Sequence, residues 1–309
     1  MSAPMMPRRR WLTQVWPPVA GGLAALGMGG WPALASAAEP GRAGQGASPR
    51  LISLSGGMTE VVYRLRAEHL LVATDTTSTY PVAALKTPKV GYMRQLSAEG
   101  VLSLRPTAVL GTLEVGPAGV LAQLREAGVA LHLVKADHSF DELLAKVRVA
   151  AKASLMPDVG KALEAQLQND WKATQQRVAQ AADARRQKGQ APRKVLFVMN
   201  HGGSAQGAGK GTAAQAMIDL LGAVNVLDAG QGYKPLTPEA VAQAAPDVIL
   251  TTQESIELRG SVEAFWQQAG LAFTPAARQQ RLVSMDAMAL LGFGPRLPQV
   301  LDELNRRLA

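Results

Sequence analysis

The sequence predicts an α/β protein of two Rossmann-like lobes, each with a mainly parallel sheet, joined by a long interlobe α-helix and with a cleft between the lobes. Short apolar runs that are typical of strands alternate with helix-like segments in the first part of the chain, and the same alternation returns in the last part. Between these parts lies a long segment rich in Ala, Leu, Lys, Glu and Gln. Alternation of strand and helix favours right-handed βαβ units, and a chain of this length can bury two cores.

The first 38 residues have the pattern of an export signal. The run RRRWL at residues 8–12 precedes an apolar, glycine-rich stretch at 15–30, and small residues at 35–37 suit a signal peptidase. The apolar stretch is too short and too interrupted by proline and glycine to span a membrane. The arginines also fit a twin-arginine signal, so both export routes stay open. We expect residues 1–38 to be removed and residues 39–49 to form a flexible start of the mature chain.

Composition narrows the compartment and the partners. The chain has no cysteine, which excludes lipid attachment through a cysteine, disulfides and thiolate metal ligands. We therefore expect a soluble protein of the periplasm. The formal net charge is +8 at pH 7, but the charges are scattered and no Lys/Arg-rich run follows Arg185 and Arg186. This pattern does not support nucleic-acid binding, whereas a positive surplus is compatible with an anionic ligand.

The first lobe is expected at residues 50–138. Its strands are predicted at 51–54, 70–74, 108–111 and 131–134, and its helices at 59–66 and 116–127.

Residues 139–190 are expected to be a mostly helical interlobe segment. Apolar residues recur at helical spacing over 140–151 and again over 159–167, so one stripe packs on the lobes while the charged face is solvated. Pro157 predicts a break, with a shorter helix before it and a long helix after it. One long helix between the lobes predicts a stiff pair with limited closure.

The second lobe is expected at residues 191–309. Its strands are predicted at 195–199, 225–227, 248–251 and 281–284, and its helices at 212–221 and 238–244.

Tyr80 is the candidate metal ligand. It lies in DTTSTYP, directly after an apolar strand, and the proline that follows it restricts its backbone to extended conformations. The C-terminal edge of the strands faces the ligand crevice in open α/β sheets, and a phenolate there can bind ferric iron. A surface-loop tyrosine is the alternative.

His201 is the best candidate for a group on the opposite wall of the crevice. It follows the first strand of the second lobe in VMNHGG, which again places it at a C-terminal strand edge. A solvated loop histidine is the alternative. His69 and His132, beside and inside apolar strands, are expected to be structural, and His138 is expected to have a capping or surface role.

The segment GSAQGAGKGT (203–212) lies between a strand and a helix, as a phosphate-binding loop does. Ser204 stands where the Walker pattern needs glycine, and Gly211 where it needs Ser or Thr. We therefore do not expect nucleotide hydrolysis. The glycines would let the backbone approach a flat ligand or turn tightly.

Several ordered motifs from residue 50 to the end resemble the haem-binding periplasmic proteins of bacterial haem ABC importers. This family belongs to the helical-backbone group of binding proteins that also carries cobalamin and ferric siderophores. The motifs are RLISLSGGMTEVVYRL, DTTSTYP, KVGYMRQLSAEGVLSLRPTAVL, GAGKGTAAQAMIDLLGAVNV, LTPEAVAQAAPDVIL and LLGFGPRLPQVLDEL.

The resemblance implies ferric haem b as the transported ligand. In the family the tyrosine of the DTTSxYP motif ligates the iron, and that position is Tyr80 here. Some relatives use a histidine of the second lobe as a further axial ligand, which makes His201 a candidate for that role. Many members carry a basic residue two positions after the tyrosine, where this chain has Val82. Support for a phenolate is then expected from Arg94 or Lys86.

Three further residues are expected around the porphyrin. The guanidinium of Arg94 is expected to bind a haem propionate, with a surface ion pair as the alternative. Tyr92 and Tyr233 are expected to stack on the porphyrin or rim it, although aromatic residues near strand ends also close cores.

The resemblance also implies delivery to an inner-membrane ABC permease with its ATPase. In the family an acidic residue near the start of an exposed helix of each lobe docks on permease arginines, and Glu60 and Glu239 match those places. Each carboxylate could instead only stabilise a helix N-terminus. We expect a monomeric carrier and no enzymatic activity.

Two alternatives remain open. The first is a ferric siderophore or cobalamin carrier of the same group, which needs no protein ligand to the metal. The second is a haem-processing enzyme, for which Asp75 and His201 are the only acid/base candidates. No GxSxG, HExxH or cysteine nucleophile is present.

Overall fold

The structure is a computed structural model that describes residues 48–201, 203–227 and 230–308. Residues Ala47–Ala309 form one compact unit. The expected signal peptide and all but the last two residues of the expected flexible start lie outside the described residues. Within the described residues, no helix is both long enough and apolar enough to cross a membrane.

The first sheet consists of four parallel strands in the order β2-β1-β3-β4. The strands are β1 (Leu51–Leu54), β2 (Leu71–Thr74), β3 (Ala108–Thr112) and β4 (Ala130–Val134). Successive side chains of a strand point to opposite faces, so Leu51 enters one core while Ile52 and Leu54 enter another. Both faces of this sheet are therefore covered.

Helices supply the two cores of the first sheet. Met58 and Val61 of α1 (Gly56–Arg64) and Leu143 of α4 (Phe140–Ala153) share the core of Leu51. Val101 of α2 (Ala98–Leu102) and Leu124 of α3 (Ala118–Glu126) share the core of Ile52. The helices of this part are α1 (Gly56–Arg64), η1 (Glu68–Leu70), η2 (Val82–Lys86), α2 (Ala98–Leu102) and α3 (Ala118–Glu126).

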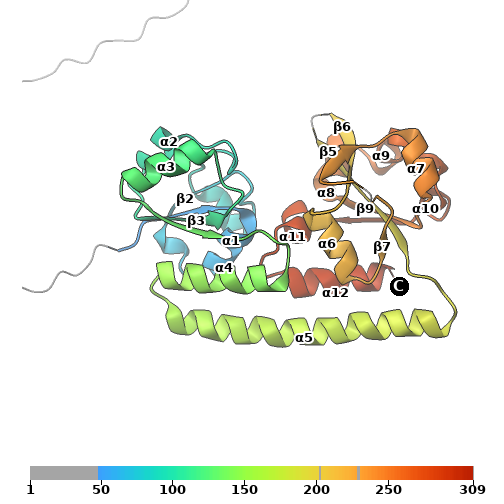
Figure 1. Ribbon diagram of the computed structural model, residues 1–309, viewed down its shortest axis with the longest axis horizontal. Coiled ribbons are helices and arrows are strands. Elements are labelled where there is room, and N and C mark those ends of the chain that lie inside the picture. Colours follow the sequence, from blue (N-terminus) through green and yellow to red (C-terminus); the bar gives the residue numbers. More distant parts are fainter. Residues whose placement is uncertain (1–47, 202, 228–229, 309) are drawn as a thin grey trace, which may run out of the picture. The chain divides into compact units, whose positions relative to one another are not determined.

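The segment between the sheets is helical, with the predicted break. α4 (Phe140–Ala153) begins at Ser139, whose Oγ accepts a hydrogen bond from the Glu142 amide at 3.1 Å, and α5 (Pro157–Gln187) begins at its proline. α5 runs alongside α4 and α12 (Leu297–Leu308), as Figure 1 shows. The rings of Phe140 and Trp171 stack at 4.8 Å and join α4 to α5.

The second sheet is mixed. Its path is β10-β9-β5-β6-β8, and β7 pairs with β5. β5, β7, β9 and β10 are parallel to one another, β6 pairs antiparallel with β5, and β8 pairs antiparallel with β6. The strands are β5 (Lys194–His201), β6 (Ser204–Ala208), β7 (Val224–Asn225), β8 (Tyr233–Pro235), β9 (Val248–Thr252) and β10 (Leu282–Met285).

The antiparallel strand β6 occupies half of the glycine-rich segment that resembled a phosphate loop. Ser204 pairs with His201, so β6 returns antiparallel alongside β5 directly after β5 ends. A Cβ at Gly207 would overlap the ends of the Leu227 and Leu236 side chains, so both of these side chains would have to shift. The glycine therefore makes room for core packing within a strand.

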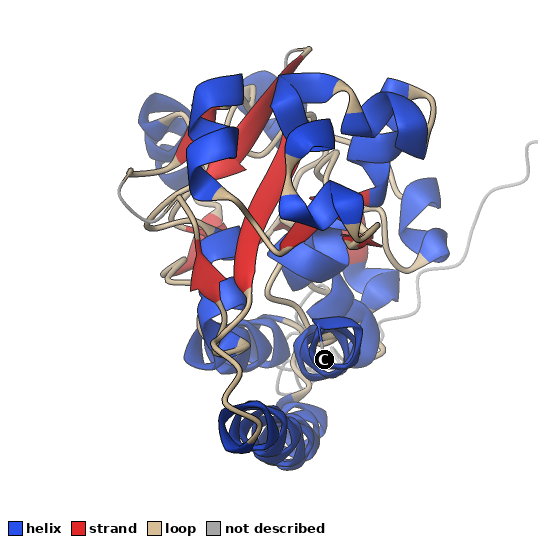
Figure 2. Ribbon diagram, turned by 90° about the vertical axis from the view of Figure 1, so that its right-hand side faces the viewer, coloured by secondary structure: helices blue, strands red, loops and turns tan. Residues whose placement is uncertain are grey.

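Helices also lie on either side of the second sheet (Figure 2). Met217 of α6 and Leu304 of α12 belong to one core, and Val241 of α7 and Phe265 of α9 belong to the other. The helices of this part are α6 (Ala213–Leu220), α7 (Pro238–Ala244), α8 (Gln253–Arg259), α9 (Val262–Trp266), η3 (Gln268–Phe273), α10 (Pro275–Arg278) and α11 (Ala287–Leu291).

A buried lysine ties α4 to the segment before α12. Lys146, which is 1% exposed, donates from Nζ to the carbonyl oxygens of Gly292 and Phe293 at 3.0 and 3.2 Å and pairs with Glu142 at 2.6 Å. On α1, a Cβ at Gly57 would collide with the carbonyl oxygen of Gly292. Elements of the first lobe thus meet the chain after β10 at backbone contact distance.

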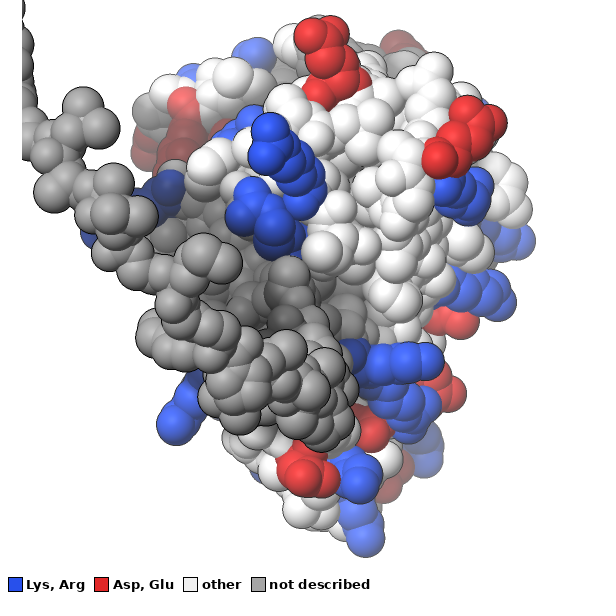
Figure 3. All heavy atoms as spheres, turned by 90° about the vertical axis from the view of Figure 1, so that its left-hand side faces the viewer, with Lys and Arg blue, Asp and Glu red and all other residues white. Residues whose placement is uncertain are grey.

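Figure 3 shows how charged side chains are distributed on one face of the described protein. Lys/Arg and Asp/Glu side chains are intermixed there around a broad area that carries neither charge.

Candidate functional site

The loop that carries Tyr80 is held by a buried carboxylate. Asp75, the first residue after β2, accepts hydrogen bonds from the Thr77 amide at 3.2 Å, from Thr77 Oγ1 at 2.6 Å and from Ser78 Oγ at 2.7 Å. The Asp75 amide donates to the Ser53 carbonyl of β1. Since Asp75 and Ser78 are fully buried, the polar residues of DTTSTYP fix the shape of the loop.

A lysine supports the same loop. The Nζ of Lys89 donates to Thr74 Oγ1 and to the Ser78 carbonyl, both at 2.7 Å, and to the Ala84 carbonyl at 3.2 Å. Burial lowers the pKa of Lys89, and the charge of Asp75 opposes that shift. Lys89 could not be identified from the sequence, because its partners are mostly backbone carbonyls.

Tyr80 itself points out of this rigid loop. Its side chain is 43% exposed, in contrast to the buried Asp75 and Ser78. The guanidinium carbon of Arg296 lies 3.9 Å from the centroid of the Tyr80 ring, which is a cation–π contact. The Tyr80–Pro81 peptide bond is cis.

Arg296 is fixed by two carboxylates. Its Nε and Nη2 donate to Glu60 at 2.9 and 2.6 Å, and Nη2 also donates to Asp286 at 3.2 Å. Burial lowers the pKa of Arg296, whereas the hydrogen bonds and charges of Glu60 and Asp286 raise it. Together the two carboxylates outweigh burial, so the net shift of the pKa is upward. Arg296 is therefore a permanent cation against Tyr80.

The basic residue next to Tyr80 was expected to be Arg94 or Lys86, but in the structure it is Arg296. Arg94 pairs instead with Glu114 at 2.5 Å, and Lys86 is exposed at the end of η2. Arg296 is far from Tyr80 in the sequence, so spacing around Tyr80 could not reveal it. Its motif, GFGPRLP, was part of the family resemblance, and that was the only signal available.

The exposed large hydrophobic side chains of residues 48–138 all follow the C-terminal ends of β2 or β3. They are Tyr80, Val82, Leu85, Tyr92 and Leu113. Ligands bind at this edge of open parallel sheets, and apolar side chains exposed together mark binding surfaces. The edge combines a phenol on a fixed loop with apolar groups able to cover a flat ligand.

Tyr233 comes from the second sheet. Its ring lies 6.3 Å from that of Phe197. Burial raises the pKa of Tyr233 to about 12, while a backbone hydrogen bond with Ala214 and the charge of Arg94 oppose the shift. Arg94 of the first lobe is therefore near enough to act on Tyr233 of the second. Tyr233 remains a neutral phenol at physiological pH and suits a donor role.

The four histidines differ in what can be said of them. His201 ends β5, and its side chain lies outside the described part of the chain. His69 is exposed and His132 is half-buried in β4. His138 packs beside Phe293 at 5.5 Å, and its amide donates to the Glu142 carboxylate at 2.7 Å, as expected for a residue at a helix start. In the described residues, no group of three or more His, Cys, Asp or Glu side chains could hold a metal ion.

Of the two acids expected to dock a partner, Glu60 does not fit. It is 3% exposed and its carboxylate is taken by Arg296. Burial raises the pKa of Glu60, and the Arg296 hydrogen bonds oppose the shift. A carboxylate inside the protein cannot meet a partner surface.

Glu239 is exposed in the first turn of α7, which Thr237 caps through its side chain. Glu99 has the same setting in the first lobe: it is exposed in the first turn of α2, which Ser97 caps. The repeated pattern of Ser or Thr followed two residues later by Glu could have identified Glu99 from the sequence.

A profile of the periplasmic binding protein family matches residues 51–289. The chain is similar to the periplasmic heme-binding protein BhuT in complex with two hemes, with 43% identity, a TM-score of 0.77 and coverage of 84% of this chain and 97% of that one. It is also similar to the apo form of the periplasmic heme-binding protein RhuT from Roseiflexus sp. RS-1, with 38% identity, a TM-score of 0.76 and coverage of 84% and 98%.

A more distant similarity concerns another ligand class. The chain is 25% identical over 219 residues to the vitamin B12-binding protein of Pectobacterium atrosepticum, which covers 71% of this chain and 76% of that protein.

Proposed function

The chain belongs to the periplasmic binding protein family, and on that premise we propose that it is the haem carrier of an ABC importer. It binds ferric haem b with the phenolate of Tyr80 as an axial ligand, and it delivers the haem to an inner-membrane permease. Its solved neighbours are haem-binding proteins, which supports this ligand over others. The site of action is the periplasm.

The observation that carries the proposal is the setting of Tyr80. The side chain is exposed on a loop whose polar groups are satisfied by Asp75 and Lys89, so the phenol is held in place before a ligand arrives. Ferric iron is one of the partners that a tyrosinate binds well. Apolar side chains at the same edge, among them Val82 and Leu113, suit the face of a porphyrin.

In this proposal Arg296 supports the Tyr80 phenolate in place of the basic residue that many family members carry at the position of Val82. It presents a positive charge to the face of the Tyr80 ring, and a neighbouring cation favours an anionic oxygen. Because Glu60 and Asp286 hold the guanidinium from the other side, the contact does not depend on a mobile side chain.

The remaining haem contacts belong to the proposal as well. Arg94 is half-exposed, so a haem propionate can replace Glu114 as its partner or bind to Arg94 beside Glu114. Tyr92 rims the porphyrin, Tyr233 donates from its neutral hydroxyl, and His201 supplies a second axial ligand.

The test is a hemin titration of the purified mature protein, followed by the Soret absorbance and by the charge-transfer band of tyrosinate-ligated ferric iron. We expect saturable binding by the wild type and by the control variant Tyr63→Phe, a substitution in α1. Tyr80→Phe should weaken hemin binding at least about tenfold, or about 1.4 kcal/mol, and abolish the charge-transfer band. Unchanged affinity and spectrum in Tyr80→Phe would remove Tyr80 from the site.

Cobalamin is the second candidate, because the vitamin B12-binding relative matches most of the chain. Cobalamin brings its own cobalt ligands, so a protein phenolate would be superfluous. Saturable cobalamin binding that is insensitive to Tyr80→Phe, together with no saturable hemin binding, would replace haem by cobalamin.

For delivery, we propose that Glu99 and Glu239 dock on the permease, with Glu99 in the place first assigned to Glu60. Both carboxylates are exposed at the starts of short capped helices, one in each lobe, and can meet a basic permease surface. With the reconstituted importer, Glu99→Gln and Glu239→Gln should each reduce stimulation of the ATPase by the haem-loaded carrier. The control Glu126→Gln, an exposed acid of α3, should stimulate like the wild type.

A further inference from the structure

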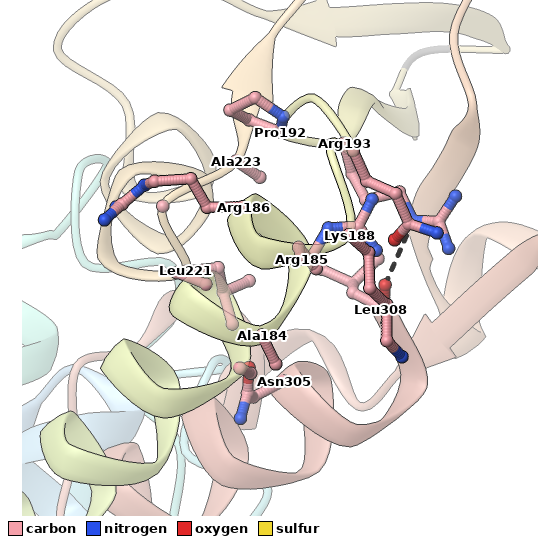
Figure 4. A pocket seen from close by; sticks show the side chains of 14 residues that line it. Ala184, Arg185, Arg186, Lys188, Pro192, Arg193, Leu221, Ala223, Asn305 and Leu308 are labelled. Atoms are coloured by element: carbon pink, nitrogen blue, oxygen red, sulfur yellow. Dashed lines mark hydrogen bonds between the residues drawn. The ribbon is translucent and has the colours of Figure 1, made fainter.

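A cavity of about 560 Å³ lies at the C-terminal end of α5 (Figure 4). Its walls come from the last turns of α5, from the residues between α5 and β5, from the turn after α6 and from the end of α12. The volume is in the range of small-molecule sites.

This cavity is at the opposite edge of the second sheet from the proposed haem site. Arg193 lines the cavity and directly precedes β5, whereas His201 ends the same strand. Gly222 and Ala223, which also line it, precede β7, a strand parallel to β5. The cavity is thus separate from the edge that carries Tyr80.

Among the described residues, four cationic side chains and no acidic side chain line the cavity: Arg185, Arg186, Lys188 and Arg193. Arg186 is engaged by Asp183 at 3.0 Å. Arg185 is different, because its Nε is buried and has no hydrogen-bond partner within the described chain, while its Nη2 donates to the Ala191 carbonyl at 3.2 Å. A buried donor left without an acceptor costs free energy, and the guanidinium group that carries this donor belongs to a residue that lines the cavity.

Positive charge converges at Arg193. Its Nε donates to the Leu308 carbonyl at 3.2 Å. Burial lowers the pKa of Arg193, the charges of Arg185 and Arg281 lower it further, and Asp247 opposes them. Arg281 lines an adjoining cavity that shares Arg193 with the first. Arg193 is therefore close enough to two other guanidinium groups to be affected by their charges.

The rest of the lining is apolar. Ala184, Leu221, Ala223 and Leu308 line the cavity between the cationic side chains, as Figure 4 shows. A simple inorganic ion would leave these groups without a partner. A ligand with an anionic head and a small apolar body would cover both kinds of surface.

We propose that this cavity is a second ligand site, which takes a small organic oxyanion. A phosphate or carboxylate head lies against Arg185 and Arg193, and the apolar body lies against Ala184, Leu221 and Ala223. Guanidinium groups match both heads through paired hydrogen bonds, so the two sources share one chemistry.

The test is calorimetric titration of the full mature protein at low salt with phenyl phosphate, benzoate and inorganic phosphate. Phenyl phosphate or benzoate should bind saturably, and whichever binds more tightly identifies the head. Inorganic phosphate should bind at least about tenfold more weakly than phenyl phosphate, because it lacks the apolar body. No saturable binding of either organic anion would overturn the proposal, and inorganic phosphate binding as tightly as phenyl phosphate would overturn an organic ligand.

Two variants locate the binding. Arg185→Gln removes the orphaned donor, and Ala184→Glu adds a negative charge at an exposed alanine that lines the cavity. Each should weaken binding at least about tenfold. Arg148→Gln, an exposed arginine of α4 paired with Glu164, is the control and should bind like the wild type.

Binding retained in both cavity variants, or lost equally in the control, would place the anion elsewhere and overturn the proposal. If Arg185→Gln does not fold by circular dichroism, Ala184→Glu decides the matter alone. Hemin binding should be unchanged in all three variants, so this test is independent of the proposed haem site.

Discussion

The guanidinium of Arg296 lies over the ring of Tyr80, 3.9 Å from its centroid, and at the same time makes two hydrogen bonds to Glu60. Tyr80 belongs to the loop after β2, Glu60 to α1 and Arg296 to the segment directly before α12. One side chain therefore connects the candidate ligand loop with the C-terminal part of the fold. This connection makes the stability of the fold and the geometry of the site depend on the same ion pair.

The first prediction concerns the strength of that ion pair. Arg296→Gln should lower the free energy of unfolding by about 3 to 5 kcal/mol, because it leaves the buried carboxylate of Glu60 without its cation. The double variant Glu60→Gln, Arg296→Gln should recover part of this loss, since no buried charge is then left unpaired. Urea unfolding of the wild type, both single variants and the double variant measures the coupling.

Arg306→Gln is the matched control for this cycle. Arg306 belongs to the same helix region and pairs with Glu303 at 2.6 Å, but its side chain is 67% exposed. The expected loss is no more than about 1 kcal/mol. Additive losses for Glu60 and Arg296 in the double variant would contradict a coupled pair.

The second prediction is the pH dependence that Glu60 contributes. Burial raises the pKa of Glu60 above the value of 4.5 that applies to the unfolded chain, against the opposing Arg296 contacts. The folded state then keeps the proton to higher pH than the unfolded state does. The stability from this proton is complete below pH 4.5 and is lost as pH rises through the folded pKa.

Urea midpoints of the wild type and Glu60→Gln across this range measure that dependence. The stability of the wild type relative to the variant should fall as pH rises above 4.5. A relative stability that rises with pH would show that Arg296 overcomes the burial of Glu60.

The sequence was sufficient for the features that depend on local pattern. The family resemblance and the α/β fold class are confirmed. Strands such as β1 and β9 are short, mainly apolar runs that are buried along their whole length, and Pro157 starts α5 at the predicted break. Each of these follows from neighbouring residues alone, so periodicity and proline chemistry reveal it.

Features that depend on distant partners were not predictable in this way. β6 lacks the alternation of apolar and polar residues that is typical of strands, so the glycine-rich segment was not predicted as a strand. It forms a strand because its backbone pairs with the edge of β5. Glu60 was expected on the surface because the family resemblance assigned it to permease docking near the start of an exposed helix. Its partner, Arg296, is in contact only because the fold brings α1 beside the segment before α12.

The third prediction tests how tightly the lobes are joined. A Cβ at Gly57 would collide with the Gly292 carbonyl oxygen, so Gly57→Ala should cost about 1 to 3 kcal/mol of unfolding free energy through overpacking. Gly119→Ala in α3 is the control, because a Cβ there meets nothing within 4 Å. That substitution should be neutral or stabilise by up to about 1 kcal/mol through helix propensity. Equal effects of the two substitutions in thermal or urea unfolding would contradict a close-packed joint.

The fourth prediction concerns Tyr233 in alkaline solution. Burial raises its pKa from 10.0 to about 12, so the folded protein keeps this phenolic proton after the unfolded chain has lost it. The stability that this proton contributes is present below pH 10 and falls as pH rises from 10 towards 12. An ultraviolet absorbance titration should therefore show a tyrosinate step centred at about pH 12 that is absent in Tyr233→Phe.

The step should also be absent after denaturation, because unfolding removes the burial that causes the shift. A step that persists in Tyr233→Phe would assign the buried phenol to another tyrosine and would weaken the case for Tyr233 as a neutral donor facing the ligand.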